Sequence, residues 1–205
     1  MLIRRASSSD AEELAILAER TFRKTFQDGN TQEDMDLHCH ASYSTNIQLK
    51  EILRQDWITL VCEYESKLIG YAQLRWEEFP PCVNSIHAGE ILCLYVDEPY
   101  HGKGFAQALM QKCFAEFEAK GSDPVWLGVW EHNPRAISFY RKLGFTEVGE
   151  HIFQVGSDPQ RDIIMKRSTY ASSTHILTSA FGTKLTKNSL FLRTMSLYCE
   201  DSRVN

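Results

Sequence analysis

The chain has 205 residues, of which 43% are hydrophobic, so it can bury a full core and is most simply one domain with an appendage. Its formal net charge of -5 excludes the basic field that would hold nucleic acid non-specifically or bind an anionic membrane surface. No run of about 18 apolar residues occurs and no apolar segment follows the first residues, so we expect neither a membrane span nor a secretory signal.

The cysteines indicate a compartment. The chain has six, none of them in a Cys-x-x-Cys pair, and several lie inside apolar runs. This usage is typical of buried free thiols in a reducing environment and predicts a cytoplasmic protein. His38, Cys39 and His40 have the residue types of a metal site, but no further ligand follows at a known spacing, so we expect no metal.

The first part of the chain is expected to form a strand and then helices. Residues 2–6 favour a strand, and residues 9–26 favour an amphipathic helix that begins with Ser9 and Glu12 as a capping box. A short helix around Met35 is expected next.

A further helix and a β-hairpin follow. Residues 45–55 predict the helix, with Thr45 and Gln48 as its capping pair. The β-rich runs 57–64 and 68–78 flank a short polar connection, which is typical of a hairpin.

The second half alternates strands and helices. The run "GEILCLYV" is almost continuously apolar, as expected of a strand that is covered on both faces. Asn133 is the expected N-cap of a helix that has Pro134 at its first position. The expected strands are 89–96, 125–130, 145–155 and 161–167, and the expected helices are 103–120 and 133–145. This order predicts an α/β fold with a mixed central sheet and helices on both faces.

The composition changes after Arg167. Residues 168–205 contain 13 Ser or Thr in 38 positions and show no clear hydrophobic period. We expect a domain at 1–167 and a poorly ordered tail at 168–205. The alternative is a tail that binds a partner or a second subunit, which leaves a homodimer open.

The stretch "YVDEPYHGKGFAQALM" (95–110) joins a strand to a helix through a glycine-containing loop. Glycines let backbone N–H groups approach an anion, and the helix N-terminus adds partial positive charge, so the loop suits a diphosphate. A plain tight turn has the same residues, and the loop is neither a Walker loop nor a full dinucleotide fingerprint.

Together with "VWLGVWEHNPRAISFYRKLGF", this loop resembles the GNAT superfamily of N-acetyltransferases over about residues 2–167. In that family the pattern Gln/Arg-x-x-Gly-x-Gly/Ala holds the pyrophosphate of acetyl-CoA. Its second signature, a cap Asn with a Tyr seven residues later, matches Asn133 and Tyr140. The first pattern falls on His101, Gly102, Lys103, Gly104, Phe105 and Ala106, with His in the place of Gln or Arg.

The resemblance implies the GNAT fold and a place for the cofactor. The strands 89–96 and 125–130 would splay apart, and the pantetheine arm of acetyl-CoA would pair with backbone groups near Leu94, Tyr95 and Val96. Asn133 would touch the same arm, and Lys142 would face either cofactor phosphate or solvent.

Tyr140 and Glu90 are the catalytic residues that the resemblance implies. A phenol can donate a proton to the departing thiolate, so Tyr140 is the expected general acid. An acceptor amine arrives protonated at neutral pH and needs a base, for which Glu90 is the candidate. Glu90 lies six residues before Val96, an even separation that predicts one face of the strand for both. Glu78, Glu131 or a chain of waters are the alternatives.

Three further segments, "TFRKTFQDGNTQEDMDLH", "WLGVWEHNPRAISFYRKLGF" and "HIFQVGSDPQRDIIM", resemble the bacterial spermidine/spermine acetyltransferases of the Pai type. A polyamine or related small amine is the expected substrate, and separated carboxylates would suit its charges. The candidates for binding it are Glu33, Asp34, Glu78 and Glu131. The alternatives are a peptide or protein N-acetyltransferase and a non-catalytic regulator that binds acyl-CoA.

Overall fold

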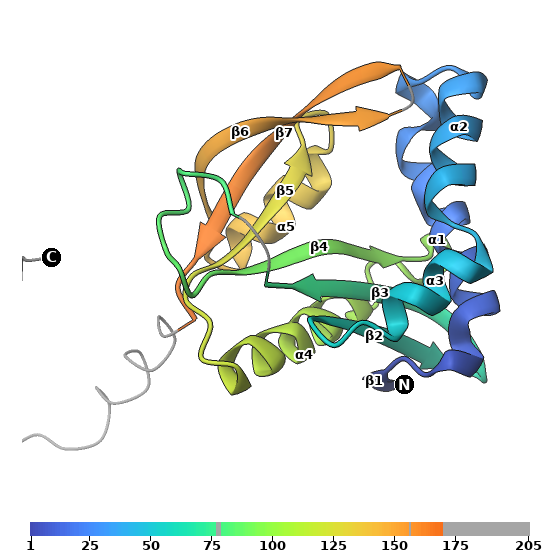
Figure 1. The fold of residues 1–205 in the computed structure, drawn as a ribbon, viewed down its shortest axis with the longest axis horizontal. Coiled ribbons are helices and arrows are strands. Elements are labelled where there is room, and N and C mark those ends of the chain that lie inside the picture. The colour runs from blue at the N-terminus through green and yellow to red at the C-terminus, as the bar shows by residue number, and fades with distance from the viewer. Residues whose placement is uncertain (77–78, 156, 170–205) are drawn as a thin grey trace, which may run out of the picture. The chain divides into compact units, whose positions relative to one another are not determined.

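The computed structural model describes residues 1–76, 79–155 and 157–169, all of which belong to one compact unit (Figure 1). The candidate substrate residue Glu78 and residues 170–205 of the expected tail lie outside the described residues. Order in the tail therefore stays a prediction. The tail's first residues are held in place, since the Thr169 hydroxyl donates to the Ser122 carbonyl over 2.8 Å.

Helices and strands alternate along the chain much as the hydrophobic pattern predicts. The elements are β1 (Leu2–Arg5), α1 (Ala11–Phe26), α2 (Gln32–Ser42), α3 (Thr45–Ile52), β2 (Trp57–Tyr64), β3 (Lys67–Arg75), β4 (Gly89–Val96), α4 (Phe105–Ala119), β5 (Val125–Trp130), α5 (Pro134–Lys142), β6 (Thr146–Val155) and β7 (Asp158–Arg167). None of the helices in the described part of the chain is both long and apolar enough to span a membrane.

The strands form one seven-stranded sheet in the order β1-β2-β3-β4-β5-β7-β6. Every neighbouring pair is antiparallel except β4 and β5, so the expected mixed sheet is confirmed. β4 and β5 pair only at Gly89 with Val125 and at Glu90 with Trp126. Beyond these pairs the two strands diverge toward α1 and α2, which opens the centre of the sheet (Figure 1).

Helices cover both faces of the sheet. On one face, Leu109 and Phe117 of α4 and Ile137 of α5 pack with Ile91 and Leu127 of the strands. On the other face, α1 packs against β2 and β3. Each face buries a hydrophobic cluster, and the opening between β4 and β5 lies at the centre of the sheet.

The helix starts differ from the predictions by a residue or two. The capping box before α1 joins Ser7 and Asp10, not Ser9 and Glu12, because a 3-10 turn precedes the helix. Ser44, rather than Thr45, caps α3 by accepting from the Ile47 N–H. Asn133 caps α5 as predicted, accepting from the Ala136 N–H over 3.0 Å.

A β-bulge in β4 changes which side chains share a face. Gln73 of β3 pairs with Cys93, whereas the next residue, Leu74, pairs with Ile91, so Leu92 is an extra residue on β4. The alternation of side chains therefore shifts at Leu92. Ile91 and Leu94 both face α4, and Cys93 faces α1.

Candidate active site

The opening between β4 and β5 holds a cleft of about 380 Å³. Several elements converge on it: the ends of β4 and β5, the first turn of α4, α5, and the second half of α1. The lining includes Thr21, Thr25, Leu94, Tyr95, Val96, His101, Ala106, Trp130, Asn133, Arg135, Phe139 and Tyr140. His101 and Ala106 of the first signature and Asn133 and Tyr140 of the second thus line one cleft.

The end of β4 directs backbone groups into this cleft. The Asp97 N–H donates to the Ile69 carbonyl of β3 over 2.8 Å. Because backbone groups alternate in direction along an antiparallel strand, the groups of Tyr95 also point to β3, and those of Leu94 and Val96 point to the cleft. Of the three backbone contacts predicted for this strand, Leu94 and Val96 have the required direction.

The glycine loop borders a second cavity, of about 370 Å³, at the N-terminus of α4. Gly102 has φ of 75° and Gly104 has φ of 85°, in the left-handed region that glycine tolerates. A Cβ at either position would meet no atom within 4 Å, so the loop presents bare backbone to open space. This arrangement fits a bound diphosphate.

The other residues of the loop have different surroundings. α4 begins at Phe105 with Gly104 as its N-cap, so the predicted start at Lys103 is too early. The Lys103 ammonium lies 5.6 Å from the centre of the Tyr100 ring, and Lys103 is not among the residues that line this cavity. Phe105, Ala106 and Lys142 do line it.

Arg135 is a site residue that the sequence analysis missed. It lines both cavities, and its guanidinium donates to Nδ1 of His101 over 2.6 Å. Nε2 of His101 lies 2.5 Å from the Val96 carbonyl, so this nitrogen carries the proton and the ring bridges α5 to β4. The atypical His therefore holds an arginine at the position where the family has Gln or Arg. Arg135 lies in the first turn of α5, where a cation is unfavourable because it opposes the helix dipole. This unfavourable placement was the feature of the sequence that could have indicated a functional role.

Tyr140 is buried at the wall of the cleft. It is 8% exposed, and its ring packs against Phe139 and Phe145 at 5.4 and 5.7 Å between centroids. Burial raises the pKa of its phenol well above the ordinary value, so the hydroxyl keeps its proton at neutral pH and is a donor rather than a base.

Cys93 lies on β4 close to the end of the strand at Val96, and a cysteine thiol is a potential nucleophile. Burial raises the pKa of its thiol to about 12, so it stays protonated and is a poor nucleophile. Cys93 is therefore not favoured as the attachment point of an acyl group.

Glu90 does not lie where the even spacing predicted. The bulge at Leu92 places its side chain on the α1 face, opposite to that of Val96, so the expectation of a shared face is wrong. Glu90 is 6% exposed and forms an ion pair with Arg75 of β3. The second contact, from Arg75 Nη2 to Glu90 Oε1, is 3.2 Å. Its carboxylate thus has a cation beside it already.

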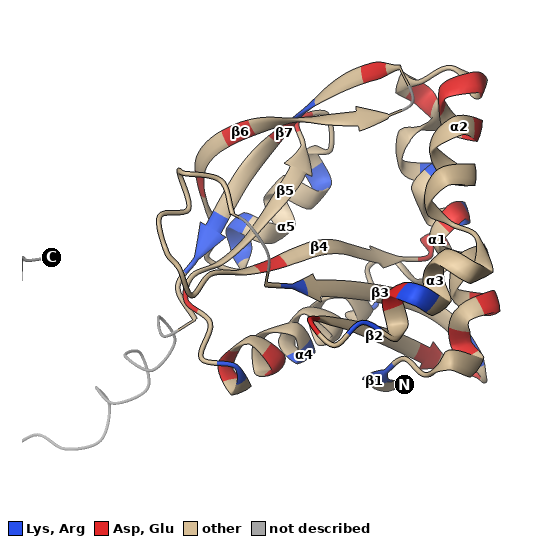
Figure 2. Cartoon of the chain, viewed as in Figure 1, with Lys and Arg blue, Asp and Glu red and all other residues tan. Residues whose placement is uncertain are grey.

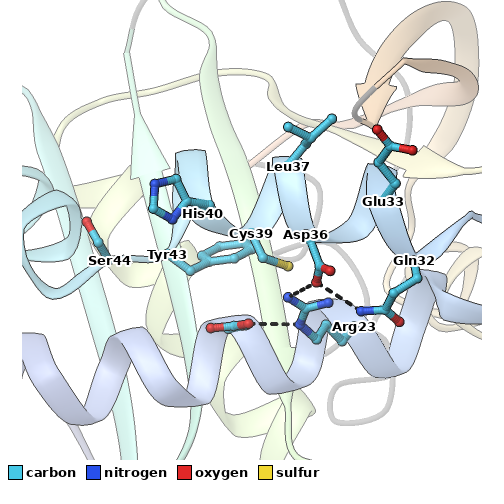
Figure 3. A pocket seen from close by; sticks show the side chains of 10 residues that line it. Arg23, Gln32, Glu33, Asp36, Leu37, Cys39, His40, Tyr43 and Ser44 are labelled. Atoms are coloured by element: carbon cyan, nitrogen blue, oxygen red, sulfur yellow. Dashed lines mark hydrogen bonds and ion pairs between the residues drawn. The ribbon is translucent and has the colours of Figure 1, made fainter.

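The candidate substrate residues do not gather at the cleft. Asp34 is committed to the fold, since it accepts from the N–H and the hydroxyl of Ser157 over 2.6 and 2.8 Å. Glu131 pairs with Arg161 over 2.6 Å. Glu33 lines a separate pocket of about 890 Å³ between α1 and α2, where Arg23 lies between Glu19 and Asp36 (Figure 3).

The sequence model of the acetyltransferase (GNAT) family matches residues 15–145. The chain belongs to this family. As a GNAT enzyme it is an acyltransferase that uses acetyl-CoA as its co-substrate.

Several GNAT relatives cover most of the chain. An uncharacterized N-acetyltransferase of Mycobacterium tuberculosis is 32% identical over 160 residues, which is 78% of this chain and 97% of that protein. The spermine/spermidine N(1)-acetyltransferase of Bacillus subtilis is 24% identical over 136 residues, or 62% of this chain and 88% of that protein. The PaiA N-acetyltransferase of Thermoplasma acidophilum, solved in complex with coenzyme A, has the same fold, with a TM-score of 0.65, 24% identity, and coverage of 82% of this chain and 98% of that one.

Proposed function

We propose that this GNAT enzyme acetylates a primary amine of a polyamine such as spermidine or spermine, by direct attack on acetyl-CoA with Tyr140 as general acid. The observation that carries the proposal is the buried, protonated Tyr140 hydroxyl in the wall of the cleft into which the Leu94 and Val96 backbone groups point. A proton donor and an oxyanion site are the two aids that acyl transfer to an amine needs.

The chain's own residues have separate roles in the reaction. The neutral amine attacks the thioester carbonyl, the carbon–nitrogen bond forms, and the carbon–sulfur bond breaks. One backbone N–H of this strand segment, that of Leu94 or of Val96, stabilises the oxyanion. Tyr140 gives its proton to the departing thiolate, and the proton lost by the attacking nitrogen restores the Tyr140 hydroxyl. The protonated thiol of Cys93 supports a single transfer step without an acyl-enzyme.

The cofactor's pyrophosphate is proposed to lie on the loop from His101 to Ala106. The open backbone of Gly102 and Gly104 supports this placement, as do the cations of Arg135 and Lys142 around the same cavity. Asn133 lines the cleft as well as capping α5, so it is proposed to contact the pantetheine arm.

A cationic acceptor is supported by the distribution of charge. Figure 2 shows acidic residues on α2 and basic residues on α5, whereas α1 carries residues of both signs. The chain's net charge of -5 likewise favours a cationic acceptor. The activity named for the Bacillus subtilis relative makes a polyamine the first acceptor to test.

Release of free CoA thiol from acetyl-CoA, measured against a panel of amines, tests the proposal. We expect turnover with spermidine and spermine above that with small diamines, amino acids and short peptides. Preferred turnover of peptides would replace the polyamine with a peptide or protein acceptor. Acetyl-CoA binding without turnover of any amine would contradict the proposal and favour a non-catalytic regulator.

A further inference from the structure

His151 of β6 and Asp162 of β7 form a pair of titratable side chains on the sheet face that α1 and α2 cover. The two residues are directly opposite each other in the strand register, and His151 Nε2 lies 3.5 Å from Asp162 Oδ2. The Asp162 side chain is 13% exposed and the His151 side chain 36%. A largely buried carboxylate is thus joined to solvent through an imidazole.

The pair lies over Gly128 of β5, the strand that bounds the cleft. A Cβ on Gly128 would come within 2.9 Å of His151 Nε2 and 3.2 Å of Asp162 Oδ2. Val129 of β5 packs toward α4 and α5, so its neighbours Gly128 and Trp130 face the opposite side. The absence of a side chain at Gly128 leaves room for the pair beside β5, whose Trp130 lines the cleft.

Two polar atoms at this place are buried without a partner among the described residues. They are Oδ1 of Asp162 and Nε1 of Trp130. These two residues are directly paired across β5 and β7, and Trp130 lines the cleft. Leaving a buried donor or acceptor unpaired costs about 1–3 kcal/mol, so both groups call for a polar partner.

Tyr95 of β4 connects this pair electrostatically with the catalytic tyrosine. Its pKa is raised well above the ordinary value, first by burial and further by Cys93, Tyr140 and Asp162. Asp162 and Tyr140 are thus both near enough to Tyr95, which lines the cleft, to influence its charge. Glu90, in contrast, is already paired with Arg75.

We propose that Asp162 binds the acceptor's ammonium group and takes its proton, and that His151 is a positioning residue that holds the carboxylate and passes the proton to solvent. The inference rests on the proposed amine acetylation. The ammonium gives one proton to Asp162, and the neutral nitrogen attacks the acetyl carbonyl. The second proton lost by nitrogen goes, through Tyr140, to the thiolate whose bond to carbon breaks. One proton is released overall.

Asp162→Asn tests the base directly. With spermidine we expect kcat to fall about a hundredfold, while calorimetry shows unchanged acetyl-CoA affinity and weaker spermidine binding to the CoA-loaded protein. With trifluoroethylamine, a weak base that is neutral at the assay pH, the loss of kcat should be less than about tenfold because no proton has to be removed first. His151→Gln should show the same dependence on amine basicity with a smaller loss.

Gly128→Ala provides a variant that leaves every titratable group in place. The added methyl group displaces only the ends of two side chains, so we expect unchanged thermal stability and a loss of kcat with spermidine similar in kind to that of Asp162→Asn. Glu147→Gln, an exposed carboxylate on β6 that pairs with Arg141, is the matched control and should behave as the wild type.

Three outcomes separate the possibilities. Wild-type kcat in both Asp162→Asn and Gly128→Ala would overturn the inference and leave the proposed function intact. Equal losses with strongly and weakly basic amines would show that Asp162 supports the structure rather than accepting a proton. A wild-type enzyme that turns over no amine would remove the proposed function and this inference with it.

Discussion

At the scale of single residues, burial keeps the Tyr140 phenol protonated, so it can donate a hydrogen bond but cannot act as a base. We expect Tyr140→Phe to lower kcat by about tenfold to a thousandfold with little change in acetyl-CoA affinity, because the ring remains and only the donor is lost. Stopped assays of thiol release, together with calorimetry of acetyl-CoA binding, measure the two quantities. Phe139→Leu keeps the neighbouring apolar wall and serves as the control for packing. Wild-type turnover in Tyr140→Phe would remove the general-acid assignment.

We propose that Arg135 and His101 together fill the role of one residue in the family pattern. Arg135→Ala removes a cation from both cavities, and we expect acetyl-CoA to bind about tenfold more weakly. His101→Gln keeps a side chain that can donate to the Val96 carbonyl, so its effect should be only modest. Titration of each variant with acetyl-CoA compares them. A larger loss in His101→Gln than in Arg135→Ala would contradict the proposed roles.

At the scale of elements, α2 is held to the β6–β7 turn by one carboxylate. Asp34 accepts from Thr31 in its own first turn and from Ser157 in the turn, so Asp34→Ala removes bonds between two segments distant in sequence. We expect the melting temperature to fall by about 5 °C. Asp36→Ala, which removes an exposed carboxylate of the same helix, should change it little.

Thermal unfolding followed by circular dichroism checks this expectation. The outcome also tests the expectation from the sequence that Asp34 binds the substrate. An unchanged melting temperature with a raised KM for the amine would return Asp34 to the acceptor site.

The hydrophobic pattern predicts where elements lie but not irregularities within them. The strand 89–96 and the helix starting after Asn133 are where the apolar runs and the cap predict them. The bulge at Leu92 cannot be predicted from the sequence. A bulge shifts the alternation of apolar and polar residues, and this strand is apolar almost throughout, so it has no alternation to shift. The face assigned to Glu90 was wrong for this reason.

At the scale of the whole molecule, buried tyrosines make stability sensitive to alkaline pH. Burial raises the pKa values of Tyr43, Tyr71, Tyr95 and Tyr140 above the ordinary 10. Below that pH the folded and unfolded states are equally protonated and the stabilisation is fully present. As the pH rises above it, the unfolded chain loses protons that the folded chain keeps, so the free energy of unfolding falls.

We expect this loss to begin near pH 10, at up to about 1.4 kcal/mol per pH unit for each tyrosine. Urea unfolding midpoints measured from pH 8 to 11 test the expectation. A Tyr71→Phe variant, whose ring sits in the core with 1% exposure, should lose less stability over this range than the wild type. A constant midpoint through pH 11 would contradict the argument.

The amino-acid sequence by itself determined the kinds and order of the elements, the glycine loop with its helix, the Asn133 cap and, through these, the family. All of these depend on residues near one another in the chain, where periodicity, capping and backbone freedom act directly. Only the tertiary structure decided that β4 and β5 part after two residue pairs, that Arg135 meets His101 across 34 positions, and that His151 and Asp162 lie over Gly128. Such juxtapositions depend on strand register and sheet order, which arise from the packing of both layers together and leave no mark in any short stretch of sequence.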